Sequence, residues 1–262
     1  MIKAPLHKQA FSLVELSIVL VILGLLTGGV LTGQSLIRAA ELRAVTTEHQ
    51  KYQTAVMTFR DKYFAIPGDM RNATDFWGAM TNCAVASPSG TGTETCNGDG
   101  DGILDLASDA SRTGERFGFW QQLSNAGLIE GTYTGIAGPD GEADAEPAIN
   151  SPKSKLGEAM WATVNRQTII SSIFYQFNYG NTFEFGRPIS NNTAYAVSIS
   201  PEEAWNIDTK IDDGRPGTGK VMATQFSSCT TSTDNSDAQR LAGEYALSET
   251  GNKCSFIFPF AF

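Results

Sequence analysis

The longest apolar stretch of the chain lies near its N-terminus and predicts one membrane-spanning helix. Residues 11–30 read FSLVELSIVLVILGLLTGGV, and Glu15 is the single charged residue among these twenty. About twenty apolar residues at 1.5 Å each span the roughly 30 Å hydrocarbon core of a bilayer. The ten residues before the stretch contain Lys3 and Lys8 but no acid, which favours a cytoplasmic location for that end. We therefore expect a single anchor, with the rest of the chain on the outer side of the membrane.

The same helix is expected to continue beyond the membrane to about Tyr63. Residues 34–63 contain no proline, and their apolar positions recur at helical spacing with charged residues on the opposite face. Pro67 and Gly68 follow as helix breakers. The whole helix would be about 80 Å long at 1.5 Å per residue. Residues 11–33 are then its membrane-spanning part, and residues 34–63 are an amphipathic continuation.

Residues 64–262 predict an exported α+β domain with long loops. Helices are expected within residues 113–127 and from Pro201 to about Ile211, where Ser200 and Glu203 form a capping box. β-branched and aromatic content predicts strands at residues 168–177, 193–200 and in the C-terminal sequence CSFIFPFAF. Phe76 and Trp77 are expected to pack into the core. The predicted fold is α+β, with an antiparallel sheet packed on the long helix.

The length of the apolar segment argues against a cleaved secretory signal, and Glu15 argues against a plain signal anchor. The apolar run is longer than the 7–15 residues typical of a signal peptide, and no small-residue cleavage site closes it cleanly before Leu36. A carboxylate within an apolar helix costs roughly 2.5–3.5 kcal/mol on insertion scales, so it is normally paired or functional. The span has no cation of its own. We therefore expect the partner of Glu15 to come from another subunit.

The sequence KQAFSLVELSIVLVILGLL resembles the N-terminus of type IV prepilins and of the pseudopilins of type II secretion. The strong part of the resemblance covers residues 8–35, roughly a tenth of the chain. In that family a membrane aspartyl peptidase removes a short basic leader before a Phe, and the new terminal amine is methylated. The resemblance places this cleavage between Ala10 and Phe11, so that residues 1–10 are the leader. The family prefers glycine before the cut, where this chain has alanine. The resemblance also implies that the Glu15 carboxylate pairs with the amine of a neighbouring subunit.

The resemblance implies a structural subunit, and not an enzyme, of a type IV pilus or a pseudopilus-type filament. The long loops of the head favour a minor or specialised subunit. The implied partners are other pilin-like subunits, the prepilin peptidase, the inner-membrane assembly platform, and membrane lipid before assembly. The implied location is the bacterial inner membrane, with a single span and a periplasmic head, and the cell surface after assembly. A membrane-anchored, calcium-dependent binding or adhesion module is the alternative.

Charge and cysteine content agree with an exported protein. The formal net charge of −9 becomes −11 when Lys3 and Lys8 are removed with the leader, so nucleic acid is not an expected partner of the head. No sequence motif of a serine hydrolase or a zinc peptidase is present. The four cysteines suit an oxidising compartment and two disulfides. Three pairings are possible, and the most economical is the sequential one, Cys83–Cys96 with Cys229–Cys254. A zinc site is the alternative, but no C-x-x-C motif supports it.

Residues 97–105, NGDGDGILD, predict a structural calcium loop. Oxygen-bearing side chains fall at positions one, three, five and nine of such a loop, with a glycine at the sixth and a backbone carbonyl at the seventh. The predicted ligands are Asn97, Asp99, Asp101, the carbonyl of Ile103, and Asp105. The twelfth position is Ser108 where a calcium loop has glutamate, so Asp109 or Glu115 would have to close the shell. The alternative is a solvated turn rich in Asp and Gly.

Overall fold

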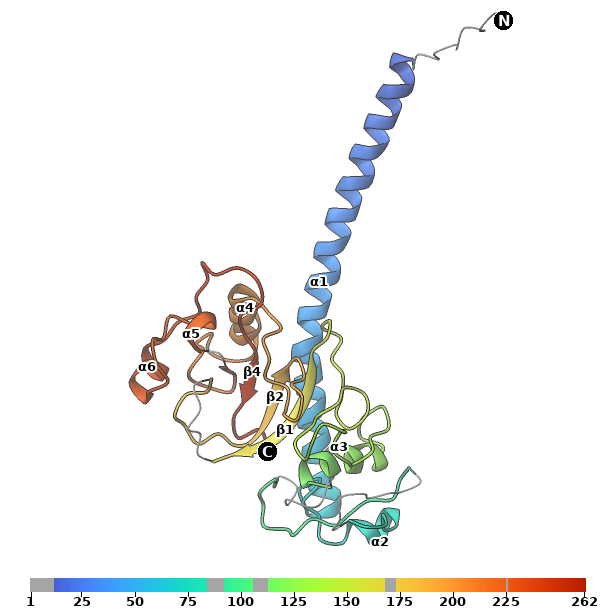
Figure 1. Ribbon diagram of the computed structural model, residues 1–262, viewed down its shortest axis with the longest axis vertical. Helices are drawn as coiled ribbons and strands as arrows, with labels where there is room; N and C mark the ends of the chain where they lie inside the picture. The colour runs from blue at the N-terminus through green and yellow to red at the C-terminus, as the bar shows by residue number, and fades with distance from the viewer. Residues whose placement is uncertain (1–11, 84–91, 106–112, 168–172, 225) are drawn as a thin grey trace, which may run out of the picture. The chain divides into compact units, whose positions relative to one another are not determined.

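A computed structural model describes residues 12–83, 92–105, 113–167, 173–224 and 226–262 (Figure 1). Its first element, α1, spans Leu13–Tyr63 in 51 residues, which confirms the long helix expected from the sequence. The chain divides into two compact units, Met1–Glu41 and Leu42–Phe262, and α1 contributes to both. We describe the two units separately.

In the first unit, α1 exposes its apolar side chains on every side. Residues 12–32 are all exposed, and an 18-residue window of this helix has a mean hydropathy of 2.4 with none of it buried. The helix is therefore long and apolar enough to cross a membrane. Exposed apolar surface on this scale is stable only in lipid or against other apolar helices.

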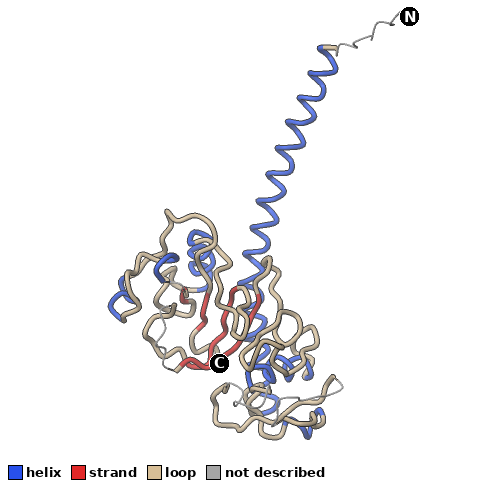
Figure 2. Tube along the Cα trace, in the orientation of Figure 1, coloured by secondary structure: helices blue, strands red, loops and turns tan. Residues whose placement is uncertain are grey.

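The second unit is built on a four-stranded antiparallel sheet, which confirms the predicted α+β, pilin-like layout (Figure 2). The strands lie in the order β1-β2-β4-β3. The longest pairing joins β1 to β2 over seven residues, from Met160 opposite Gly186 to Arg166 opposite Gly180. The bounds of the strands are β1 Met160–Arg166, β2 Gly180–Gly186, β3 Met222–Ala223 and β4 Phe256–Phe258.

The part of α1 within the second unit packs on this sheet through aromatic side chains. The His49 ring stacks on Phe258 with ring centroids 4.3 Å apart, and Tyr52 meets Trp161 edge-on at 5.6 Å. Glu48 adds a polar clamp at the edge of this core. Its carboxylate accepts hydrogen bonds from Ser154 Oγ at 2.7 Å, from the backbone N–H of residue 155 at 3.0 Å, and from Trp161 Nε1 at 2.7 Å. Helix, loop and strand are thereby fixed to one another.

Shorter helices complete the second unit. They are α2 Ala73–Trp77, α3 Glu115–Asn125, α4 Pro201–Ile211, α5 Phe226–Cys229 and α6 Asp237–Ala242. The helices predicted within residues 113–127 and from Pro201 correspond to α3 and α4. The predicted capping box is formed, since Ser200 Oγ accepts from the backbone N–H of Glu203 at 3.3 Å and the Glu203 carboxylate accepts from the Ser200 N–H at 3.0 Å.

Both disulfides form in the sequential pairing. Cys83 is bonded to Cys96 and Cys229 to Cys254, with Cα–Cα distances of 5.8 and 5.0 Å. The first bridge closes the loop that follows α2, and the second ties the end of α5 to the segment just before β4.

Two strand predictions and one core prediction were wrong for the described residues. Residues 193–200 form only isolated bridges, Arg187 with Ala196 and Ile199 with Cys254, because their backbone pairs with two different segments, one just after β2 and one just before β4. Of residues 168–177, the last five form turns and bends, and residues 168–172 lie outside the described residues. Trp77 packs against the core as expected, but the Phe76 side chain is 54% exposed.

Candidate functional site

Glu15 lies in the first turn of α1, where its carboxylate is exposed. One carboxylate oxygen accepts a hydrogen bond from the backbone N–H of Ser12 at 2.9 Å, and Ser12 Oγ accepts one from the N–H of Val14 at 3.3 Å. A negative charge is favourable at a helix N-terminus because unpaired N–H groups point outward there. The other carboxylate oxygen is available to an ammonium group of another chain. Ala10 and Phe11, the predicted cleavage and methylation site, lie outside the described residues.

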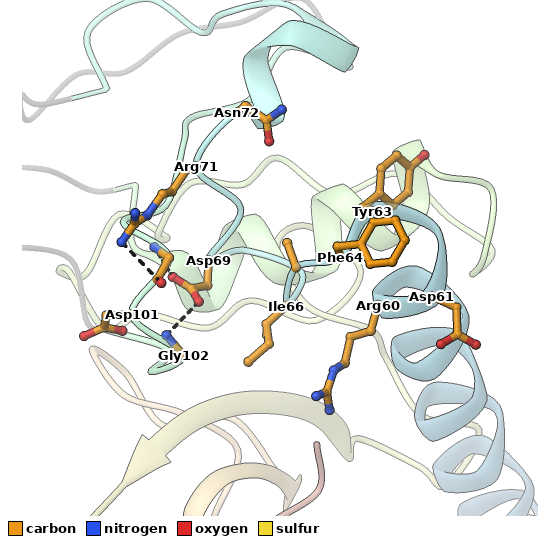
Figure 3. Close-up of a pocket in the computed structure, with 12 residues that line it drawn as sticks. Arg60, Asp61, Tyr63, Phe64, Ile66, Asp69, Arg71, Asn72, Asp101 and Gly102 are labelled. Carbon is orange, nitrogen blue, oxygen red and sulfur yellow. Dashed lines mark hydrogen bonds between the residues drawn. The ribbon is translucent and has the colours of Figure 1, made fainter.

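The predicted calcium loop, residues 97–105, is called the acidic loop below. Two carboxylates from outside this loop hold its backbone, and Figure 3 shows one of them, Asp69, with its hydrogen bond to Gly102. Asp69 accepts from the N–H groups of Gly100 at 2.5 Å and Gly102 at 2.9 Å. Glu115, the first residue of α3, accepts from the N–H groups of Asp99 and Asp105, both at 3.0 Å. Four backbone donors are thus satisfied by two acidic side chains.

The loop's own acids converge near these supports. The carboxylates of Asp99, Asp101 and Asp105 offer oxygens within 4.8 Å of one another, and those of Asp69, Asp99 and Glu115 do the same. Within the loop, Asp99 accepts from the N–H of Asp101 at 3.0 Å. Oxygens at such spacing, drawn from alternate residues of a turn, suit a hard cation such as Ca²⁺.

The structure brings together three of the five calcium ligands that the sequence predicts. Asp99, Asp101 and Asp105 cluster, whereas the Asn97 side-chain oxygen accepts from the backbone N–H of Thr74 at 2.9 Å. The Asn97 side chain is therefore bound to the backbone at the start of α2 in this structure. The N–H of Ile103 donates to Asp101 at 2.7 Å. Ser108 and Asp109 lie outside the described residues.

The spacing of residues within the acidic loop does not predict that Asp69 and Glu115 hold the loop backbone. Asp69 comes from the turn after α1, and only the fold brings it to the acidic loop. The sequence suggests Glu115 only as a ligand that would close the shell, whereas in the structure its two oxygens accept hydrogen bonds from loop N–H groups. Gly100 and Gly102 of the acidic loop adopt positive φ values of 71° and 89°. Glycine is favoured at both positions because it has no Cβ.

Burial makes ionisation less favourable for three of the carboxylates in and around the acidic loop. Burial raises the pKa of Glu115 to about 7 and raises the pKa of Asp69, in each case against backbone hydrogen bonds that lower it. Burial and the nearby Asp101 and Asp99 also raise the pKa of Asp105. On the other side, Arg71 donates to the backbone carbonyls of residues 99 and 100. A bound divalent cation would stabilise the ionised form of all these carboxylates.

A pocket of about 720 Å³ lies between the end of α1 and the acidic loop (Figure 3). Phe64 and Ile66 supply apolar surface, and Arg60 and Arg71 supply positive charge. The lining residues are Arg60, Asp61, Tyr63, Phe64, Ala65, Ile66, Asp69, Arg71, Asn72, Gly100, Asp101 and Gly102.

A second acidic cluster lies at the end of α4. Asp208, Asp212 and Asp213 offer oxygens within 4.8 Å of one another, but Asp208 is fully buried. Its carboxylate accepts from Tyr245 Oη at 2.8 Å and from the N–H of Gly214 at 3.2 Å. Burial raises the pKa of Asp208 to about 7. This carboxylate therefore links α4 to the region closed by the second disulfide.

Comparison with known protein families places a conserved motif at the N-terminus of the chain. The model of the prokaryotic N-terminal methylation motif, the signature of type IV prepilin-like proteins, matches residues 6–31. No curated protein and no solved structure matches the chain. The matched segment contains Ala10, Phe11 and Glu15, and it confirms the resemblance seen in the sequence. It supports a processed pilin-like or pseudopilin-like subunit that assembles with other such subunits, and it points to a structural role.

Proposed function

We propose that this chain, which carries the N-terminal methylation signature of type IV prepilin-like proteins, is a structural subunit of a type IV pilus or pseudopilus-type filament. The observation that carries the proposal is the exposed apolar part of α1, residues 12–32, with a single carboxylate in its first turn. Lipid covers this surface while the subunit is anchored. The corresponding helices of neighbouring subunits cover it after assembly.

Glu15 is proposed to set the position of each new subunit. After cleavage before Phe11, the new terminal ammonium is a cation in an apolar environment, and the Glu15 carboxylate of a neighbour is its counter-charge. Pairing removes the cost of two unpaired charges, each worth several kcal/mol at low dielectric. A subunit placed one residue out of position would leave both charges unpaired.

Substitution of Glu15 tests this role directly. Glu15→Ala is expected to be cleaved by the prepilin peptidase but to yield at least tenfold fewer sheared filaments, measured by immunoblot of surface fractions. Glu41→Ala is the control, because Glu41 is an acid of the same helix outside the apolar stretch. Filaments at wild-type levels from Glu15→Ala would exclude the pairing mechanism.

Calcium binding by the acidic loop is a further part of the proposal. It is supported by the convergence of Asp99, Asp101 and Asp105 and by the raised pKa values around them. A calcium concentration one hundred times the Kd would stabilise the head by about 2.7 kcal/mol, since the unfolded loop offers no formed site. The full chain in detergent is expected to show a higher Tm in Ca²⁺ than in chelator. Asp101→Asn should abolish that shift and Asp237→Asn, on exposed α6, should keep it. Equal Tm values with and without Ca²⁺ in the wild type would rule out the site.

The finer assignments rest on the same segment and on the head. We propose a single span in the bacterial inner membrane with the head in the periplasm, followed by display on an extracellular filament. The long loops around the first disulfide favour a specialised subunit over a minimal repeating one. The alternative, an anchored calcium-dependent adhesion module, would function without cleavage before Phe11, and this difference separates the two proposals.

A further inference from the structure

Phe64 ends α1 in an unusual way. It is 93% exposed, and its φ of 54° places it in the left-handed region. Its backbone N–H donates to the carbonyl of Arg60 at 2.9 Å and so closes the last turn. Figure 3 shows its ring beside Tyr63, at the rim of the 720 Å³ pocket rather than inside the core.

An exposed phenylalanine at this position adds almost no buried apolar surface to the isolated head. Helix ends with this geometry usually carry glycine, because a side chain in the left-handed region costs about 1–2 kcal/mol. A buried phenylalanine would repay about 1.5–3 kcal/mol of hydrophobic free energy, but Phe64 is not buried. The residue therefore fits a contact that lies outside the chain.

Phe64 belongs to an aromatic patch, which we define as Tyr63, Phe64 and Phe76. Tyr63 and Phe76 meet edge-on with ring centroids 5.2 Å apart, and Phe76 is 54% exposed. Asp61 and Lys62, both exposed, flank the patch on the last turn of α1. Aromatic side chains are enriched in the central contacts of protein interfaces, and polar residues form the rim around them.

The same head carries a depression that suits this patch. The proline pocket, as we call it, has a volume of about 520 Å³ and is lined by Pro147, Lys153, Glu158, Arg187, Pro188 and Ala196. Its apolar lining has the size for a phenyl ring, and its charged side chains complement those around Phe64. Lys153 and Arg187 suit Asp61, and Glu158 suits Lys62.

The two surfaces lie at different levels along α1. The proline pocket includes Lys153, next to Ser154, whose hydroxyl binds Glu48. Glu48 precedes Phe64 by sixteen residues, which corresponds to about 24 Å along a helix. Two different surfaces displaced along one axis give a head-to-tail contact, and repetition of such a contact builds an open helical assembly when the rotation between copies does not close a ring.

We propose that Phe64 of one copy of this chain inserts into the proline pocket of a second copy, so that heads stack along the filament. The inference rests on the proposed function and deepens it by naming the head contact. It commits to a second copy as the partner, because the N-terminal motif points to assembly with pilin-like subunits and the complementary pocket is on this chain.

Phe64→Gly separates this contact from folding. In the full chain the variant is expected to keep or raise the Tm of the head, since glycine relieves the left-handed strain, while the yield of sheared filaments falls at least tenfold. Phe260→Gly is the matched control, because Phe260 is also an exposed phenylalanine (60%) with a positive φ of 47°. Normal filament yield from Phe64→Gly would overturn the proposed contact.

A cysteine cross-link identifies the partner surface. All four native cysteines are in disulfides, so new thiols report only on the introduced positions. Cells that co-express Lys62→Cys and Glu158→Cys chains, which both keep Phe64, are expected to give a disulfide-linked dimer on mild oxidation, and Phe260→Cys with Glu158→Cys should give none. Wild-type filaments without the expected cross-link would overturn the contact alone. Absence of cleavage and filaments in the wild type would overturn the proposed function and the contact with it.

Discussion

Glu48→Ala tests how the head is held on α1. In the wild type the Glu48 carboxylate accepts three hydrogen bonds, from Ser154 Oγ, the N–H of residue 155 and Trp161 Nε1. Trp161 is 0% exposed and Ser154 is 5% exposed, so two of the donors lose their partner where water does not replace it. Each unsatisfied buried donor costs about 1–3 kcal/mol. The better helix propensity of alanine returns a few tenths of a kcal/mol at most. We expect a loss of about 3 kcal/mol in the free energy of unfolding.

The assay is urea unfolding of the full chain in detergent, followed by tryptophan fluorescence. The four tryptophans lie outside the apolar segment, so their signal reports on the head. Glu130→Ala is the matched control. Its carboxylate also bridges to α1, through Lys51 at 3.6 Å, but the Glu130 side chain is 95% exposed. Exposed ion pairs are worth about 0–1 kcal/mol, so this variant should differ little from the wild type.

The comparison between the two variants is decisive. A Glu48→Ala midpoint within experimental error of the Glu130→Ala midpoint would refute the polar clamp as a major contributor to stability. A reduced midpoint with an unchanged denaturant slope would support it, since the slope reports on the surface exposed by unfolding.

Three further changes probe other parts of the second unit. Burial raises the pKa of Asp208 from 3.8 to about 7, so the folded chain keeps a proton that the unfolded chain releases, and the stability due to this residue falls as pH rises from about 4 to 7. Asp208→Asn should remove a pH-dependent loss of stability on the order of 4 kcal/mol, measured by urea unfolding at a series of pH values, and an unchanged pH dependence would contradict the assignment. Gly68→Ala would place a Cβ 2.2 Å from a backbone oxygen of α3 at a φ of 86°, whereas Gly157→Ala, at a φ of 54°, meets nothing within 4 Å. We expect the first to cost at least about 2 kcal/mol more than the second, and equal costs would show that the close contact relaxes freely. Replacement of Cys83 and Cys96 by serine opens a loop of sequence separation 13 and should lower the free energy of unfolding by about 3 kcal/mol, and an unchanged midpoint would contradict this estimate.

The sequence was most informative where a signal is local and repeated. The length and helical spacing of residues 34–63 predicted the end of α1 at Tyr63, and the capping box at Ser200 predicted the start of α4. In the same way, alternate acids predicted that Asp99, Asp101 and Asp105 would converge. Each of these signals lies inside the segment whose structure it predicts, or directly beside it in the sequence.

The sequence was least informative where a residue's role depends on distant partners. Residues 193–200 have the composition of a strand, but in the folded chain they pair with two different segments, through single bridges to Arg187 and Cys254. Asp69 reads as a turn residue, and only the folded chain shows that it holds two N–H groups of the acidic loop. Phe64 was part of no pattern, because its significance lies in its exposure and its φ rather than in its spacing.

The most direct test of the account is the mature N-terminus of the protein. The full chain would be co-expressed with a prepilin peptidase, extracted from membranes, and its N-terminal peptide measured by mass spectrometry. The account predicts a chain that begins at a methylated Phe11, with Ala10 and the residues before it removed. A chain that retains Met1 in the presence of active peptidase would contradict the filament-subunit proposal and favour a permanently anchored binding module.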